Sequence, residues 1–335
     1  MKSKNKILVT GADGFIGSHL VERLIKNGDN VKAFCVYNPR GSFGWLDTLP
    51  NHIKDKIDFV LGDIRDPLCV KESMKDCNKV FHLAALIGIP YSYVAPSSYL
   101  DTNIHGTLNV VQAARELEVE KIIHTSTSEV YGTAQFVPIS EAHPLAAQSP
   151  YAATKIAADQ IALSYWKSFG TPVTILRPFN TYGPRQSNRA VIPSIITQIN
   201  SGNNKIKLGN ISPTRDFNFV SDTCDAFIAV ANSNRTLGQV INSASKFEIS
   251  IGETANLIAE IIGKEIEIIS DRNRFRPKLS EVNRLFGDNS LLLELTNWNP
   301  KFSGLEGFKK GLEITCEWFK NDKNISIYKS ENYSI

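Results

Sequence analysis

The first half of the chain alternates short apolar runs with amphipathic segments of helical period. The apolar runs are typical of buried strands, and we expect strands at residues 7–10, 31–36, 58–61, 79–83, 121–125 and 173–177. Strands that alternate with helices predict a parallel, doubly wound sheet with helices on both faces. The expected fold class is therefore α/β with a Rossmann-like sheet.

Beyond Pro178 the pattern loosens, and the second part of the chain reads as a smaller α/β lobe. Helices are expected at residues 191–200, 222–232, 250–262 and 305–319. Ser250 and Glu253 have the spacing of a capping box at the start of the third of these. We expect residues 1–178 to form the Rossmann domain, residues 179–330 a C-terminal substrate lobe interleaved with it, and residues 331–335 a tail.

Composition and charge exclude several classes of protein. The formal net charge is +3 with no lysine–arginine block, so neither nucleic acid nor a membrane surface is an expected partner. The apolar run before Gly11 has four residues, too few for a signal peptide or a membrane span. The five cysteines are scattered without a Cys-x-x-Cys motif, which favours a reduced cytoplasmic protein and no metal site.

A glycine-rich turn follows the first expected strand directly. Gly11, Gly14 and Gly17 stand between that strand and an amphipathic segment that ends near Gly28. In a strand–turn–helix unit, such glycines allow a tight turn, the approach of a pyrophosphate to backbone amides, and close helix–strand packing. The turn therefore predicts a dinucleotide site.

A second group of residues carries the chemistry of alcohol oxidation. Ser149 and Pro150 predict the start of a helix that places Tyr151 and Lys155 on one face. An ammonium there is expected to favour the phenolate of Tyr151 and lower its pKa, while Thr127, at a strand end, holds the substrate hydroxyl. Glu129 adds a carboxylate that oxidation alone does not require, so we expect further acid–base chemistry at a neighbouring carbon.

With these residues in place, the chain resembles the nucleotide-sugar epimerases, dehydratases and decarboxylases of the extended short-chain dehydrogenase/reductase superfamily. The resemblance covers almost the whole length, and its landmarks are residues 62–66, 82–85, 103–107, 177–185, 191–193, 215–217 and 276–277. Residues 37–38, 44–47 and 328–335 are most similar to the dehydratases that begin legionaminic-acid-type sugar synthesis. Those enzymes are configuration-retaining 4,6-dehydratases of nucleotide-linked N-acetylglucosamine.

The resemblance implies two sets of binding residues. The cofactor set comprises Gly11, Gly14, Phe15, Ile16, Gly17, Tyr37, Asn38, Arg40, Ser42, Asp63, Ile64, Leu83, Ala84, Ala85, Asn103 and Pro178, together with Tyr151 and Lys155. The substrate set comprises Ile87, Thr127, Asn180, Arg189, Val191, Lys207, Leu208, Arg215 and Arg276. Arg215 and Arg276 are expected at the substrate diphosphate, although each could also be a solvated surface charge, and Pro178 and Asn180 could be turn formers. Relatives pair the helices that match residues 105–118 and 151–168, which implies a homodimer.

The second expected strand departs from the usual NAD pattern. It is followed by Tyr37 and Asn38 and lacks the acidic residue expected to bind the ribose 2′-hydroxyl. Arg40 and Ser42 come next and could accommodate a 2′-phosphate. The family favours NAD as the cofactor, with NADP as the alternative.

A second departure lies between the two catalytic neighbours Thr127 and Glu129. Nucleotide-glucose dehydratases carry an aspartate where this chain has Ser128, and that aspartate protonates the departing 6-hydroxyl. Here either Glu129 acts as base and then as acid, or a water relayed by Ser128 delivers the proton. The same Thr-Ser-Glu triplet occurs in enzymes that resemble UDP-xylose synthase, so decarboxylation stays open.

The expected function is a nucleotide-sugar 4,6-dehydratase acting on UDP-N-acetylglucosamine or its GDP form. The alternatives are a 4-epimerase, which needs Thr127, Tyr151 and Lys155 but not Glu129, and a UDP-glucuronate decarboxylase, which needs a cation for the uronate carboxylate. A remote alternative is a non-catalytic NAD(P)-binding regulator. The loop at residues 86–93 is a candidate lining for the N-acetyl group, or only a packed apolar loop.

Overall fold

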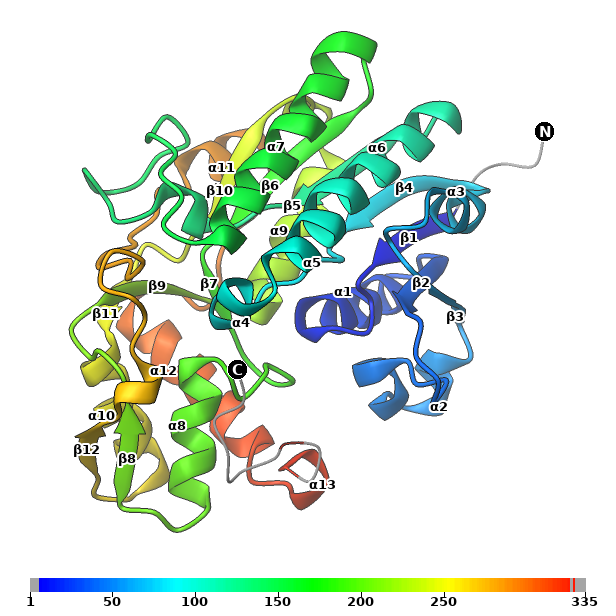
Figure 1. Ribbon diagram of the computed structural model, residues 1–335. Coiled ribbons are helices and arrows are strands. Elements are labelled where there is room, and N and C mark those ends of the chain that lie inside the picture. Colours follow the sequence, from blue (N-terminus) through cyan, green and yellow to red (C-terminus); the bar gives the residue numbers. More distant parts are fainter. Residues whose placement is uncertain (1–5, 326–327, 329–335) are drawn as a thin grey trace.

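The runs of β-branched and aromatic residues form the centre of the molecule, a parallel sheet of seven strands (Figure 1). The computed structural model describes residues 6–325 and residue 328. The strand order is β10-β6-β5-β4-β1-β2-β3, and every pairing is parallel. The bounds are β1 Lys6–Thr10, β2 Val31–Val36, β3 Ile57–Gly62, β4 Cys77–His82, β5 Lys121–Thr125, β6 Val173–Pro178 and β10 Val240–Ser243.

Helices cover both faces of this sheet. Ile7 and Val9 of β1 belong to the core beneath helices α1 (Phe15–Lys26) and α9 (Val220–Asn232). Leu8 points the other way, into the core beneath α3 (Pro67–Met74), α6 (Gly106–Glu116) and α7 (Pro150–Phe169). Successive residues of a strand face opposite sides of the sheet, so a strand covered on both faces must be apolar throughout. The α/β doubly wound fold expected from the sequence is confirmed.

The second lobe contains two small sheets, and aromatic side chains of one of them pack against a helix. One sheet has the order β11-β9-β7 and the other pairs β12 with β8. Their bounds are β7 Asn180–Tyr182, β8 Lys205–Leu208, β9 Thr214–Phe219, β11 Glu248–Ser250 and β12 Glu267–Ser270. Helices α8 (Val191–Asn200), α10 (Ile251–Ile262) and α12 (Gly304–Trp318) surround them. The ring of Phe308 on α12 stacks on Phe217 at 5.5 Å between centroids and meets Tyr182 edge-on at 5.2 Å.

The remaining elements are short. They are α2 Asn51–Lys54, α4 Ile89–Val94, α5 Pro96–Tyr99, α11 Ser290–Leu295, α13 Asp322–Ile325, the 3₁₀ turns Gly44–Thr48, Ser128–Tyr131, Asn234–Thr236 and Arg272–Arg274, and the π-helical segment Leu100–His105. Across residues 6–325 and 328, the structure contains no helix with the length and apolar character needed to cross a bilayer.

Most expected elements lie within two residues of their predicted ends. Residues 31–36, 121–125 and 191–200 agree at both ends, and the capping box of Ser250 and Glu253 is present at α10. The Ser149 side chain caps α7 by accepting a hydrogen bond from the Ala152 amide, with Pro150 at the first helical position, as predicted.

Strand β10 is the one strand of the large sheet that the sequence did not predict. Its Asn242 and Ser243 are polar yet buried, so it lacks the apolar run of its neighbours. The Asn242 amide accepts a hydrogen bond from Tyr131 Oη at 2.8 Å and donates one to the carbonyl of Ile139 at 3.0 Å. Hydrogen bonds to residues far away in the sequence therefore stabilise this strand. The division of the chain at residue 178 remains a proposal.

Gly311 tests the packing of α12 against the second lobe. A Cβ there would fall 2.0 Å from Tyr182 Oη, so Gly311→Ala forces the helix or the buried tyrosine to shift. We predict that this change lowers the free energy of unfolding by about 1–3 kcal/mol, measured by urea denaturation. Gly252→Ala on α10 is the control, because its Cβ would meet its nearest neighbour at an ordinary 3.6 Å. Equal stability of the two variants would contradict the packing argument.

Candidate active site

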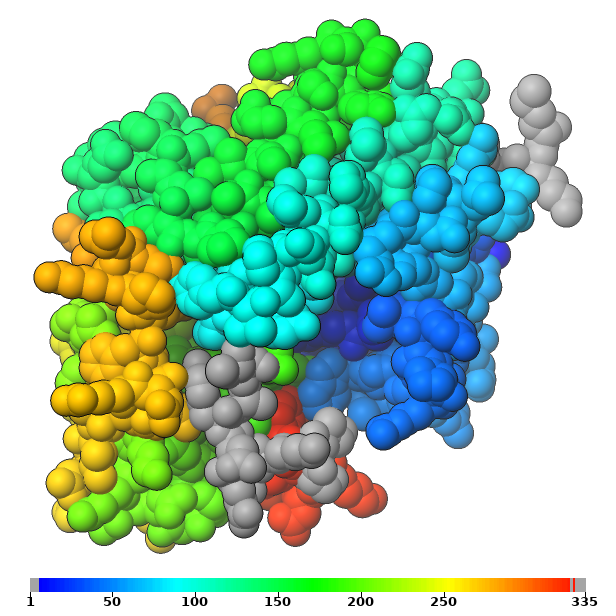
Figure 2. Space-filling model, viewed as in Figure 1, coloured from blue at the N-terminus to red at the C-terminus, as the bar shows by residue number. Residues whose placement is uncertain are grey.

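A cavity of about 1600 Å³ lies at the carboxyl ends of the large sheet, between that sheet and the second lobe. Its walls come from the turn after β1, the loops after β3, β4, β5 and β6, the first turns of α7, and the segments 185–194, 208–217 and 273–281. In Figure 2 the residues of α4 and α5, in cyan, lie between the N-terminal part in blue and the second lobe. Ligand pockets commonly measure about 300–1,000 Å³, so this cavity has room for two nucleotides.

One end of the cavity is a glycine cradle. Gly11 has φ +68°, and a Cβ there would meet the backbone of Ala84 at 2.8 Å. A Cβ on Gly17 would fall 2.1 Å from the carbonyl oxygen of Gly11. The turn and α1 therefore pack closely, and Gly14, Phe15 and Ile16 at the start of α1 line the cavity. A helix N-terminus with free amides is suited to a pyrophosphate.

Asp63 and Ile64, expected at the adenine, also line the cavity, next to Val36 at the end of β2. Asp63 pairs with Arg65 at 2.5 Å, and this hydrogen bond holds the pKa of the carboxyl below its ordinary value. The loop after β4, with Leu83, Ala84 and Ala85, forms the adjoining wall.

Four residues expected beside the cofactor are not among those that line the cavity: Tyr37, Asn38, Arg40 and Ser42. The Asn38 amide donates to the carbonyls of Val36 and Ser42, and the Ser42 hydroxyl donates to Asp47 at 2.8 Å. Tyr37 is exposed to solvent. The polar side chains of Asn38 and Ser42 thus organise their own loop, and the roles of all four in cofactor binding stay predictions.

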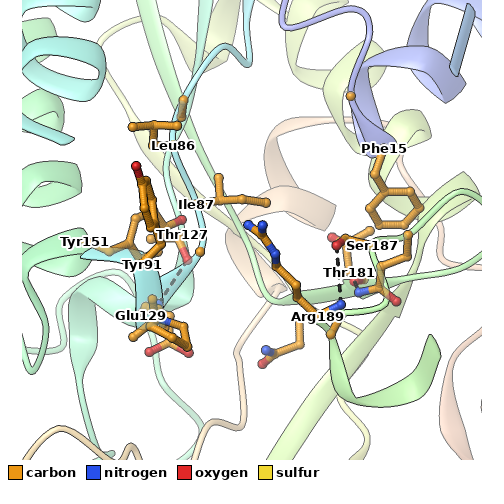
Figure 3. A pocket seen from close by; sticks show the side chains of 18 of the residues that line it. Phe15, Leu86, Ile87, Tyr91, Thr127, Glu129, Tyr151, Thr181, Ser187 and Arg189 are labelled. Carbon is orange, nitrogen blue, oxygen red and sulfur yellow. Dashed lines mark hydrogen bonds between the residues drawn. The ribbon is translucent and has the colours of Figure 1, made fainter. Parts of the chain in front are cut away.

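The catalytic candidates converge on the opposite side of the cavity. Thr127, Ser128 and Glu129 follow β5, and Tyr151 and Lys155 lie on the first turns of α7. The Thr127 hydroxyl accepts a hydrogen bond from the Glu129 amide at 3.2 Å, which shapes this turn. Figure 3 shows Thr127, Glu129 and Tyr151 together on one side, with Ile87 and Arg189 between them and Phe15.

Burial dominates the ionisation of Tyr151 and Lys155. It raises the pKa of the Tyr151 phenol above 10.0, although a hydrogen bond with Thr127 opposes the rise. The predicted lowering of this pKa was therefore wrong, because the loss of solvent outweighs the nearby favourable interactions. Burial also lowers the pKa of Lys155 from 10.5 to about 8, and its ammonium donates to the carbonyl of Thr125 at 2.5 Å.

A charged cluster in the cavity wall contains two arginines, Arg215 and Arg276, and two carboxylates, Glu129 and Glu281. Arg215 Nη2 lies 3.4 Å from Glu281 Oε1, and Arg276 Nη1 lies 3.8 Å from the same oxygen. Arg276 Nη1 also lies 3.9 Å from Glu129 Oε2. Burial lowers the pKa of Arg215, and the charge of Glu129 opposes this. Neither arginine is a solvated surface charge, and both line the cavity.

The other expected substrate residues divide into those that reach the cavity and those that do not. Ile87, Asn180, Arg189, Val191 and Leu208 line it, as does Pro178 of the cofactor set. Lys207 is exposed on β8 and does not. Asn103, assigned to the cofactor, is buried below the cavity wall. Its side chain accepts from the Leu86 amide at 2.8 Å and donates to Thr154 at 3.0 Å, so it ties the loop after β4 to α7.

The cavity wall contains residues that sequence reasoning did not assign to the site, among them Glu281, Trp45 and Tyr328. The Tyr328 hydroxyl donates to the carbonyl of Gln186 at 2.9 Å, and its ring lies 5.8 Å from that of Trp45. Trp45 and Tyr328 stand in stretches that carry the family resemblance, which was the available signal. Glu281 follows Arg276 by five residues, and no local pattern marks it as an arginine partner.

Known proteins resemble this chain over nearly its whole length. Residues 8–311 match the family model described as GDP-mannose 4,6 dehydratase. The human dTDP-D-glucose 4,6-dehydratase is 31% identical over 338 residues, with 96% of this chain and 92% of the human protein covered. The UDP-N-acetyl-alpha-D-glucosaminuronate decarboxylase of Bacillus cytotoxicus is 32% identical, with 96% of this chain and 99% of that protein covered.

Solved structures of nucleotide-sugar enzymes superpose on this chain over nearly its whole length. The dTDP-glucose 4,6-dehydratase DesIV of Streptomyces venezuelae, solved with NAD, superposes with a TM-score of 0.84 at 27% identity, covering 97% of this chain and 99% of that one. The UDP-glucuronic acid 4-epimerase of Bacillus cereus, solved with UDP-glucuronic acid and NAD, gives a TM-score of 0.83 at 29% identity, covering 94% and 99%.

Tyr151→Phe tests the alcohol-oxidising group. The change removes the phenolic oxygen and keeps the ring packed, so the fold and dinucleotide binding should persist while turnover falls by about 10²–10⁴-fold. Steady-state kinetics and dinucleotide titration measure the two effects. Tyr182→Phe is the matched control, since Tyr182 is also buried but lies outside the cavity wall. A near-normal rate in Tyr151→Phe would remove this residue from the chemistry.

Proposed function

Within the extended short-chain dehydrogenase/reductase family of NAD-dependent nucleotide-sugar dehydratases and epimerases, to which the chain belongs, we propose that this protein is a nucleotide-sugar 4,6-dehydratase. The observation that carries the proposal is the position of Glu129. Its carboxylate lines the cavity beside Thr127 and Tyr151. Oxidation at C-4 does not need a base at this place, whereas a reaction that also removes a proton from the neighbouring carbon does. A 4-epimerase uses Thr127, Tyr151 and Lys155 alone.

NAD is the cofactor, as in the related structures solved with it. The cradle of Gly11, Gly14 and Gly17 fits its pyrophosphate, because a side chain at the first or the third glycine would collide with backbone. Asp63 and Ile64 would hold the adenosine end, and Tyr151 and Lys155 lie towards the other end. The chemistry that NAD supplies is acceptance of a hydride from C-4 of the sugar and its return to C-6.

The protein's own groups move the protons. Thr127 orients the 4-hydroxyl, and Tyr151 takes its proton as C-4 becomes a ketone. Since burial favours the neutral phenol, Tyr151 needs a positive charge nearby to act as a base, and Lys155 supplies one from the next turn of α7. The new ketone acidifies the C-5 proton, and Glu129 removes it.

Loss of the 6-hydroxyl completes the elimination. The hydroxyl leaves as water and needs one proton, which either protonated Glu129 or a water held by Ser128 can deliver. Both groups are buried and line the cavity. The Arg276 guanidinium lies near this base, with 3.9 Å between Arg276 Nη1 and Glu129 Oε2. When hydride returns to C-6, C-5 takes up one proton, and the proton that Tyr151 accepted from the 4-hydroxyl balances it.

The substrate we propose is UDP-N-acetylglucosamine or its GDP form, as in legionaminic-acid-type synthesis. Arg215 and Arg276 line the cavity and can bind its diphosphate, because one guanidinium group can donate two parallel hydrogen bonds to phosphate oxygens. The apolar side chains of Leu86 and Ile87 on the loop after β4 offer a surface for the N-acetyl methyl. We further propose a cytoplasmic homodimer, on the basis of the family.

Decarboxylation of a nucleotide-linked uronic acid is the second candidate, and Arg276 favours it. A decarboxylase needs a cation near the C-6 carboxylate, and the Arg276 guanidinium lies beside Glu129. One of the relatives above is a decarboxylase. Mass spectrometry of the product separates the candidates. Loss of water indicates a dehydratase, loss of carbon dioxide a decarboxylase, and unchanged mass an epimerase.

Glu129→Gln tests the role of the base. The variant should still oxidise C-4, so the absorbance of the reduced cofactor should increase after substrate is added. Water loss and the exchange of the C-5 proton with solvent should fall by about 10²-fold or more. Glu281→Gln is the matched control, because it removes the other carboxylate that pairs with Arg276 and should leave elimination intact. Water release by Glu129→Gln at the normal rate would exclude Glu129 as the base.

A further inference from the structure

One buried charged group takes no part in the chemistry described so far. Asp159 lies on α7, four residues after Lys155, and is wholly shielded from solvent. Its Oδ2 accepts hydrogen bonds from Ser126 Oγ at 2.8 Å and from Arg177 Nε and Nη2 at 3.1 and 2.9 Å. Its Oδ1 lies 3.3 Å from His124 Nε2. A carboxylate so deeply buried needs partners that hold its charge.

The groups around Asp159 come from five elements. His82 on β4 and His124 on β5 have ring centroids 5.4 Å apart, and burial lowers the pKa of both, so they are neutral near pH 7. Arg177 on β6 donates to Tyr131 Oη at 2.9 Å, in the turn after β5. The charged members of the cluster are therefore Asp159, Arg177 and Lys155, one anion for two cations.

Asp159 is linked to the catalytic residues in two ways. Residues four apart on a helix share a face, so its charge acts on Lys155. Burial lowers the pKa of Lys155, and the charge of Asp159 opposes that fall. Through Ser126, Asp159 also holds the strand end between Thr125, which accepts the Lys155 hydrogen bond, and Thr127.

We propose that Asp159 is a positioning residue that keeps Lys155 in its charged form and ties the end of β5 to α7. The proposal rests on the oxidising set of Thr127, Tyr151 and Lys155. Dehydratase, epimerase and decarboxylase all use that set, so the proposal does not depend on which of them is right. Without Asp159, the buried ammonium of Lys155 would lose the negative charge that opposes its desolvation, and Lys155 would give up its proton at a lower pH.

The charge is tested with Asp159→Asn, which keeps the shape and an acceptor for Ser126. In protein labelled with ¹³Cε-lysine, NMR should show Lys155 titrating about one pH unit or more lower than in the parent protein. The Lys155 signal is identified by its absence in Lys155→Met. This measurement needs no substrate. A failure of the Asp159 proposal can therefore be distinguished from a failure of the proposed dehydratase activity. An unchanged titration of Lys155 would overturn the electrostatic role.

The rate profile gives a second readout. Lys155 loses its charge as pH rises through its pKa, so the upper limb of kcat/KM against pH, which reports the free enzyme, should move to lower pH in Asp159→Asn by the same amount. Asp222→Asn is the control. It removes another buried carboxylate, one that accepts from the Lys301 and Phe302 amides, and it should leave the limb in place. An equal shift in both variants would mean a general loss of stability.

Ser126→Ala tests the mechanical link separately. The variant keeps the charge of Asp159 and removes the hydrogen bond that holds the strand end. We expect kcat to fall roughly tenfold or more, because a small displacement of Thr127 disturbs the reacting geometry, while the titration of Lys155 stays unchanged. A normal kcat would overturn the link between β5 and α7.

Discussion

A short contact between the end of β5 and helix α7 sets the geometry on which the active site depends. Lys155 donates to the carbonyl of Thr125 at 2.5 Å, and Ser126 donates to Asp159 at 2.8 Å. The strand end and the helix carry the hydroxyl, the carboxylate and the phenol to which we assign the proposed chemistry. A parallel sheet brings its strand ends to one edge, so the glycine cradle after β1 faces the same cavity.

Burial at this edge determines what the site can do. It raises the pKa of Tyr151 and lowers that of Lys155. Both shifts favour the neutral forms of Tyr151 and Lys155. Proton transfer from the sugar hydroxyl to Tyr151 at neutral pH therefore needs fixed charges that offset them. The family performs several reactions with one oxidising set, and the charges beside it distinguish them. Here these are Glu129 and Arg276, whose charged atoms lie 3.9 Å apart.

The sequence predicts the parts of this structure that depend on local patterns. Apolar runs located six of the seven strands of the large sheet, and the spacing from Tyr151 to Lys155 located the catalytic face of α7. Strand β10 was missed because Asn242 is buried through partners far away in the chain. The pairing of Glu281 with both arginines and the raised pKa of Tyr151 also depend on tertiary contacts and burial, which no local spacing encodes.

The central claim is that one sugar is oxidised at C-4 and reduced at C-6 within a single binding event. It is tested most directly with nucleotide sugar deuterated at C-4. The account predicts a 4-keto-6-deoxy product, lighter by one water, that carries the deuterium at C-6. Label retained at C-4 with unchanged mass would establish an epimerase, and label lost to free cofactor a simple dehydrogenase. Either result would contradict the account.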